Sequence, residues 1–211
     1  HLALTRAGGD WKLFLDGSVV NSATWTGTMS NASYPISIGR DTFNNGATRG
    51  YMNGYLDDFR ILKGYAKYTA DFVPPTSAVG TSVSETVNDL NVLYMPFDST
   101  ETTNSIASSQ TSLYLPFDSD TNDDSAQSHT VTNNGVTISS AQSKFGGYSA
   151  LFDGTNDYLS IPSDSSLVFG DEDFTVEFFI YTNDDTPQSP FTHRDGPVSY
   201  THLRAHETKK H

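Results

Sequence analysis

Residues 51–78 read YMNGYLDDFRILKGYAKYTADFVPPTSA and contain the strand around which the rest of the chain is interpreted. From Tyr55 to Ile61 successive side chains point to opposite sides of an extended chain. One face carries Tyr55, Asp57, Phe59 and Ile61, and the other carries Leu56, Asp58 and Arg60. Pro74 and Pro75 cannot continue a central strand. The stretch predicts a strand followed by an irregular exit.

Short strands are predicted on both sides of this stretch. Upstream they lie at residues 2–6, 11–15, 18–20 and 34–39, and Asp16-Gly17 is typical of a two-residue hairpin turn. Residues 43–50 are predicted as a loop. Downstream of a polar connector at 76–88, strands are predicted at 113–119, 136–139, 149–152, 158–161 and 174–181, with 149–161 forming a hairpin across Asp153-Gly154. Helical periodicity is missing outside the C-terminal tail, so the fold class is all-β.

The opening strand of the downstream set occurs twice. LYMPFDS at 93–99 and LYLPFDS at 113–119 are nearly identical, which indicates either a duplicated strand or a short relic module. We favour 113–119 as the working copy, because a full series of strands follows it. At the other end of that series, FTVEFFIY at 174–181 has aromatic residues on both faces, so its second face is partly covered or binds a ligand.

Composition narrows the possible functions. The 211 residues include no cysteine, which excludes disulfides and thiolate zinc sites. The formal net charge of −13 argues against nucleic acid as a partner, because phosphates bind Lys and Arg. The sequence also lacks an apolar stretch long enough for a membrane span. We expect most of the acidic residues to serve solubility, and some to attract divalent cations.

The C-terminal tail is expected to be foreign to the fold. Residues 198–208 read VSYTHLRAHET, which matches the translation of a transposase-type sequencing adaptor in one frame. We therefore exclude residues 198–211, and do not interpret His202, His206 and His211 as a metal cluster. With His1 in place of methionine, the tail predicts a fragment of a longer protein.

The two sets of strands resemble halves of laminin-G-like, concanavalin A-like jelly-roll lectin domains. LALTRAGGDWKLFLDGSVV, YPISIGRD and GYLDDFRILKGYAKYTADFVPPT resemble a second half, and the region from LYLPFDS through FGGYSALFDGTNDYLSIP to FTVEFFIYT resembles a first half. The resemblance implies residues 1–78 as the C-terminal half of one module, 79–112 as a linker and 113–197 as the N-terminal half of the next. It also implies a sandwich of two antiparallel sheets, incomplete or assembled from both halves, of phage tail-fibre or bacterial adhesin type.

Two groups of residues are candidate binding sites. Calcium prefers carboxylate and carbonyl oxygens, so Asp153 and Asp157, joined by Asp57 and Asp58, form a candidate Ca²⁺ site. Asp118, Asp120, Asp123 and Asp124 form a second acidic group, and simple turn chemistry is the alternative for the loop carboxylates. Sugars stack on aromatic rings and bond planar polar groups, which makes candidates of Trp25, Arg40, Asp41, Phe43, Asn44 and Tyr51. For the tryptophans, core packing is the alternative.

Catalysis is not expected. Glycoside hydrolysis needs a carboxylate pair on one strand face, whereas Glu172 and Glu177 are five residues apart and point to opposite faces. The leading hypothesis is a non-catalytic module that binds cell-surface polysaccharide, with calcium as a candidate cofactor, in an extracellular or virion-surface protein. Neighbouring repeats of the same protein would be its other partners. The alternatives are a structural spacer repeat or an accessory binding module of a secreted polysaccharide-degrading enzyme.

Overall fold

The computed structural model describes residues 1–29, 34–43, 47–80, 83–84, 105–106, 108–185, 187–193 and 202–203. Their regular elements are short strands and two 3-10 turns, Ser108–Gln110 and Ser165–Leu167. The strands are β1 (Leu2–Ala7), β2 (Asp10–Leu15), β3 (Ser18–Thr24), β4 (Ile36–Ile38), β5 (Asp41–Phe43), β6 (Ala47–Arg49), β7 (Asn53–Lys63), β8 (Val83–Ser84), β9 (Ser105–Ile106), β10 (Thr111–Leu115), β11 (Thr132–Asn134), β12 (Thr137–Ser139), β13 (Ser149–Asp153), β14 (Tyr158–Ile161), β15 (Phe174–Thr182), β16 (Phe191–His193) and β17 (His202–Leu203). Among the described residues, no helix is long and apolar enough to cross a membrane.

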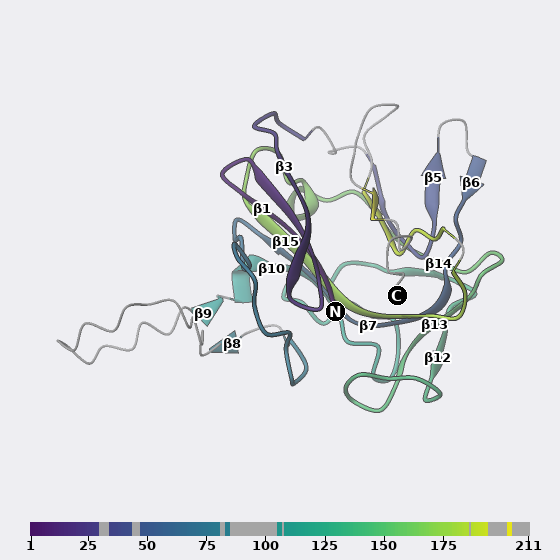
Figure 1. Cartoon of the computed structure of the whole chain (residues 1–211). Coiled ribbons are helices and arrows are strands. Elements are labelled where there is room, and N and C mark those ends of the chain that lie inside the picture. Colours follow the sequence, from purple (N-terminus) through teal and green to yellow (C-terminus); the bar gives the residue numbers. More distant parts are fainter. Residues whose placement is uncertain are drawn as a thin grey trace.

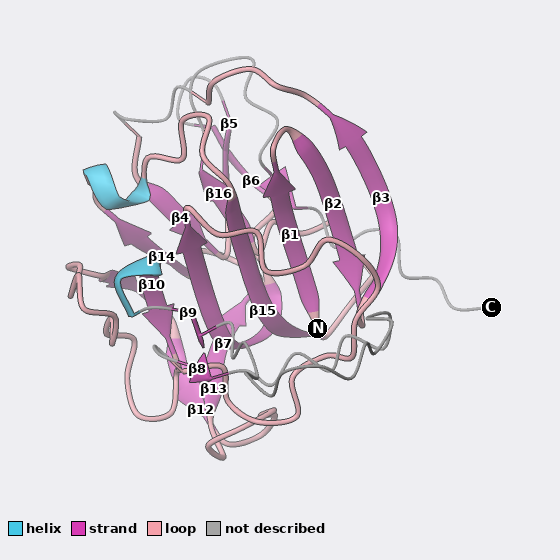
Figure 2. Ribbon diagram, turned by 90° about the vertical axis from the view of Figure 1, so that its left-hand side faces the viewer, coloured by secondary structure: helices cyan, strands magenta, loops and turns pink. Residues whose placement is uncertain are grey.

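Within this described part, the strands build two main antiparallel sheets. The large sheet has eight strands in the order β12-β13-β7-β15-β1-β2-β3, with β10 also paired to β7. The small sheet has five, in the order β11-β14-β4-β16-β17. Figure 2 shows β3 at the outer edge of the large sheet, with β4, β14 and β16 in the other layer. The predicted all-β sandwich is confirmed.

Both sheets contain strands from the two predicted halves. β7 pairs with β15 along one edge, and with β10 and β13 along the other. β1 pairs with β15, and in the small sheet β4 lies between β14 and β16. Figure 1 shows the purple β1 beside the yellow-green β15, although they are far apart in sequence. The halves therefore assemble into one sandwich, as the sequence allowed.

The core between the sheets draws on both halves. Phe59 on β7 stacks on Phe178 on β15, with ring centroids 5.4 Å apart. Phe169 stacks on Phe174 at 4.3 Å. Other buried members include Ile36, Ile38, Leu56, Ile61, Leu113, Leu115, Phe152, Leu159, Ile161, Val176 and Phe191. Burial of apolar side chains from both sequence halves is what holds them together.

The predicted alternation of the 55–61 strand is wrong at one point, because β7 contains a bulge. Between the pairs Glu177↔Arg60 and Phe179↔Asp57, β7 has one residue more than β15. Asp58 has φ 52°, a left-handed conformation that Asp tolerates better than most residues. The extra residue shifts the alternation, so that Leu56 joins Phe59 and Ile61 in the core.

Two loop predictions also need correction. Residues 149–161 are not a hairpin, because β13 lies in the large sheet and β14 in the small sheet. The chain crosses between the layers there, which lets Phe152 and Leu159 enter the core from opposite sides. The loop predicted at residues 43–50 includes the end of β5 and all of β6, which form a separate two-stranded sheet. The first LYMPFDS copy at 93–99 lies outside the described residues.

Residues 64–80, here called the strap, return from β7 across the outer face of the large sheet. Phe72 N donates to Gly17 O at 2.9 Å, in the turn between β2 and β3. Gly17 has φ 81°, and a Cβ there would lie 1.9 Å from Phe72 O. Only glycine fits this position, so the predicted Asp16-Gly17 turn also forms the docking point of the strap.

Candidate functional site

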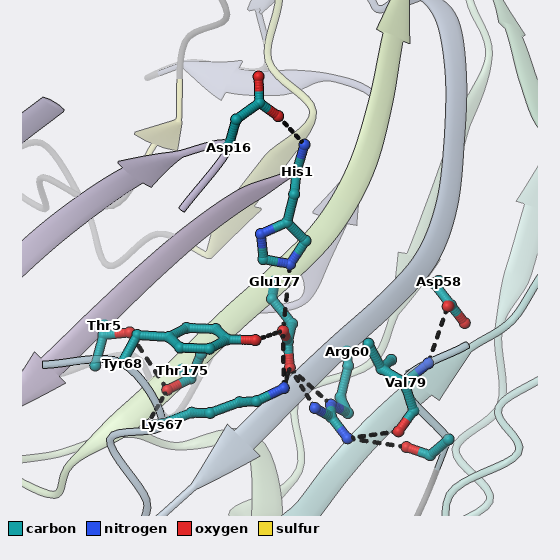
Figure 3. A network of polar contacts seen from close by, with 11 residues as sticks. His1, Thr5, Asp16, Asp58, Arg60, Lys67, Tyr68, Val79, Thr175 and Glu177 are labelled. Carbon is teal, nitrogen blue, oxygen red and sulfur yellow. Dashed lines mark hydrogen bonds and ion pairs between the residues drawn. The ribbon is translucent and has the colours of Figure 1, made fainter. Parts of the chain in front are cut away.

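Glu177 on β15 is the centre of a buried polar network under the strap (Figure 3). Its carboxylate accepts hydrogen bonds from Arg60 on β7 and from Tyr68 OH at 2.7 Å. Lys67 Nζ lies 3.3 Å from Oε1. Burial alone would raise the pKa of Glu177, but the Arg60 and Lys67 charges and the Tyr68 hydrogen bond hold it below its ordinary value. These bonds tie the strap to the sheet.

The strap covers only part of the outer face of the large sheet. Beneath it, Tyr68 and Phe72 stack with ring centroids 3.5 Å apart and pack on Ala3 and Phe14. Along β15, Thr175 Oγ1 accepts a hydrogen bond from Lys67 N and is covered, whereas Tyr181 remains 51% exposed. The second face of β15 is thus covered at one end and open at the other.

A cavity of about 570 Å³ lies at the open end. Its size falls within the range of small-ligand sites, roughly 300–1,000 Å³. The lining mixes aromatic, polar and charged side chains from both halves of the chain and from the strap. These residues are His1, Asp16, Tyr55, Asp57, Pro74, Gln142, Ser143, Lys144, Ser149, Phe179, Ile180 and Tyr181.

Aromatic rings contribute much of the lining. Tyr55 on β7 and Tyr181 on β15 meet edge to face, with centroids 6.0 Å apart. Phe179, buried one pleat away, contacts Phe145 at 5.2 Å. Lys144 Nζ lies 5.5 Å from the Phe179 ring centroid, within the range of a cation–π contact. Because paired strands hold the two tyrosines, the lining is built on a rigid support.

Asp57 is the buried carboxylate of this cavity. Its Oδ2 accepts from the backbone amides of Lys144 at 2.6 Å and Phe145 at 3.0 Å, and its Oδ1 has no hydrogen-bond partner. The pKa of Asp57 is raised to about 6, mainly by burial and to a smaller extent by the charges of Asp58 and Asp118, against the lowering effect of those two amide bonds. A buried unpaired oxygen costs free energy that a ligand donor would recover.

His1 connects the cavity to the Glu177 network. Its Nε2 lies 3.3 Å from Glu177 Oε2, and its ring packs against Phe179 with centroids 4.8 Å apart. The other ring nitrogen, Nδ1, is buried without a partner. The cavity therefore has two lining residues, His1 and Asp57, with unused hydrogen-bonding capacity.

The four carboxylates of the predicted calcium site do not converge. Asp153 pairs with Asn53, four residues from Asp57 on β7, a separation of about 13 Å along the strand. Asp58 accepts from Tyr114 OH at 2.7 Å and Val79 N at 3.0 Å, and its pKa is raised, mainly by burial. The expected approach of the Asp57–Asp58 pair to the loop is therefore not found.

Turn chemistry accounts for the loop carboxylates. Asp153 Oδ1 accepts from Thr155 N at 2.8 Å, and Asp157 Oδ2 accepts from Asp153 N at 3.0 Å. In the second acidic group, Asp123 accepts from the backbone amides of Tyr114, Ser125 and His129. Within the described ranges, no group of three or more His, Cys, Asp or Glu side chains is placed to hold a metal ion.

Of the predicted sugar-binding residues, the four whose side chains the structure describes, Trp25, Arg40, Asp41 and Tyr51, do not line the cavity. Trp25, 48% exposed, follows β3 and packs on Trp11 with ring centroids 6.0 Å apart. Arg40 stacks over the Tyr158 ring, and Asp41 is buried. Met52 N donates a hydrogen bond to Gly39 O. Met52 follows Tyr51 and Gly39 precedes Arg40, so the backbone segments that carry Tyr51 and Arg40 lie side by side. Phe43 ends β5, and Asn44 lies outside the described residues.

Sequence reasoning did not predict the cavity and named only one of its lining residues, Asp57, as a site residue, in a calcium site. The aromatic second face of 174–181 was the available signal, and it pointed at Phe179 and Tyr181. Tyr55 and Asp57 were placed on one strand face, and both do line the cavity. The sequence around Gln142 and Lys144 shows no pattern that predicts a site, because the position of a loop residue depends on the folded structure.

Comparison with known proteins agrees with the architecture. No curated protein and no solved structure matches the chain significantly. Residues 1–66, which span β1 to the beginning of the strap, match the Laminin_G_3 family, described as the Concanavalin A-like lectin/glucanases superfamily. The similarity covers only this first third of the chain, and in the structure strands from residues 111–193 complete the sandwich with it.

Proposed function

We propose that the chain is a non-catalytic carbohydrate-binding module and that the cavity on the outer face of the large sheet is its binding site. The observation that carries this proposal is the pairing of Tyr181 with Tyr55 at an open cavity. Sugar rings present apolar C–H faces that pack on aromatic rings, and polar side chains fix their hydroxyls. Gln142, Ser143 and Asp57 supply such polar groups beside the tyrosines.

The location of the cavity supports a recognition role. Two neighbouring strands of the large sheet hold the rings, so a bound sugar would meet a preorganised surface. The matched family includes lectins and glucanases, which is consistent with a carbohydrate ligand. Polysaccharide on a cell surface would be the partner of an adhesion module in an extracellular or virion-surface protein. Calcium assistance stays a prediction.

A glycan array with the full chain tests this proposal. Tyr181→Ala should abolish binding to the glycans that the unchanged chain retains, since it removes the exposed stacking ring. Trp25→Ala is the matched control, because Trp25 is about as exposed (48% against 51%) but lies outside the cavity. Each protein is assayed with calcium and with a chelator.

Each outcome has a definite meaning. Loss of binding in Tyr181→Ala alone supports the cavity. Loss in Trp25→Ala alone would move the site to the edge of the sheet near β3 and contradict the proposal. A chain that retains no glycan would favour the structural spacer.

A further inference from the structure

Asp57 stands out among the cavity residues because its charge has no balancing cation in the described structure. Its two recorded partners are backbone amides, both on Oδ2. Its neighbours Asp58 and Asp118 are also acidic and act against its ionisation. The side chain is only 3% exposed, so water does not compensate for the missing partner.

The lysine that lines the cavity, Lys144, has other contacts. Its Nζ lies over the rings of Phe145 and Phe179, at 5.8 Å and 5.5 Å from their centroids. A positive charge brought by a ligand would therefore find Asp57 available.

His1 adds a second acceptor. When the imidazole of His1 is neutral and donates Nε2–H to Glu177, its other ring nitrogen is an acceptor. Nδ1 then carries a lone pair and no proton. The unused groups of His1 and Asp57 are thus both acceptors, and they match a ligand rich in donors.

We infer that the cavity selects a sugar unit with a free ammonium group, as in a deacetylated amino-sugar polysaccharide. This inference rests on the proposed function and specifies its ligand class. The ammonium would lie by Asp57, where it gains a charge-assisted hydrogen bond, and the sugar ring would stack on Tyr181. The aromatic lining also attracts cations. A metal ion fits this place less well, because the described residues offer it no group of three ligands.

Calorimetric titration of the full chain tests the inference with two short probes, glucosamine oligomers and their N-acetylated counterparts. The salt concentration is set at about 0.15 M to screen the chain's overall negative charge. The unchanged chain should bind the glucosamine oligomer more tightly. Asp57→Asn should weaken that binding about tenfold or more, which corresponds to the loss of one charged hydrogen bond.

Two controls show whether weaker binding of Asp57→Asn is specific to the cavity and is not caused by misfolding. Asp164→Asn removes an exposed carboxylate outside the cavity and should leave both affinities unchanged. The melting temperature of Asp57→Asn verifies its fold, and asparagine can still accept from the amides of Lys144 and Phe145.

The outcomes separate this inference from the proposed function. Equal affinity for both probes, lost in Tyr181→Ala, would overturn the ammonium selectivity and leave the carbohydrate site standing. Equal weakening by Asp57→Asn and Asp164→Asn would show non-specific attraction to an acidic protein and also overturn it. If neither oligomer binds and no glycan of the array is retained, both the ammonium selectivity and the proposed carbohydrate-binding function are overturned.

Discussion

Arg60 on β7 and Glu177 on β15 face each other across paired strands, with the guanidinium Nε 2.9 Å from the carboxylate Oε1. Both side chains are fully buried. The same Arg60 group donates to Val79 O and Gly80 O at the end of the strap. One ion pair thus joins the two central strands, one from each half of the sequence, to the segment that covers them.

Replacing Glu177 by glutamine should strongly destabilise the fold. The amide leaves the Arg60 and Lys67 charges buried without a counter-charge, a loss of about 3–5 kcal/mol in the free energy of unfolding. Chemical denaturation at neutral pH measures it. Glu172→Gln is the control, because that side chain is half exposed in its pair with Lys63 and should matter little. A similar small effect for both variants would contradict the network's role.

Acid should weaken the same network. The pKa of Glu177 is lowered in the folded state, so its stabilising contribution is present above the unfolded value of about 4.5 and is lost as the pH falls through the folded pKa.

Asp57 should affect stability with a pH dependence opposite to that of Glu177, and Asp57→Asn tests it. Burial raises the pKa of Asp57 from 3.8 to about 6, so the unfolded chain releases this proton first. The free energy of unfolding therefore decreases as the pH rises through that window. Asparagine removes this penalty and should stabilise the fold above pH 6 by at most about 3 kcal/mol, with no gain below pH 4.

Melting curves across that pH range test the sign for Asp57. Asp164→Asn provides a contrast, since two hydrogen bonds from Ser166 lower the pKa of Asp164, and its replacement should not stabilise the fold at neutral pH. A variant Asp57→Asn that is less stable than the unchanged chain at pH 8 would contradict this prediction, and would mean that a cation stabilises the Asp57 carboxylate.

The bulge at Asp58 leads to a further prediction. Asp58→Ala should cost about 3 kcal/mol, because it removes the acceptor of Tyr114 OH and Val79 N and places a Cβ residue without polar compensation in the left-handed region. Asp58→Asn keeps an acceptor and tolerates that backbone, so it should cost about 1 kcal/mol. Equal losses would show that charge, and not geometry, holds the bulge. Denaturant midpoints provide the comparison.

This bulge also shows where sequence reasoning stopped. Alternation located ten of the seventeen described strands, most of them in the large sheet, and assigned both faces of 174–181 correctly, because each of these strands buries one face locally. It failed at Asp58, since one extra residue reverses the faces and follows from pairing with a distant strand. It likewise read 149–161 as a hairpin, because the pattern of a strand does not say which sheet it joins. The cavity was out of reach for the same reason, as Tyr55, Lys144 and Tyr181 meet only after the halves assemble.

Assembly of the two halves predicts one cooperative unfolding transition. Phe59 and Phe178 come from different halves and stack in the core, so replacing either by alanine should cost about 3–5 kcal/mol and shift the whole melting curve. Because the two rings share one contact, the double variant should lose less than the sum of the single losses. Scanning calorimetry on a monomer verified by light scattering measures these effects. Two separate transitions, or aggregation of the unchanged chain, would mean that residues 2–63 and 111–193 do not complete each other.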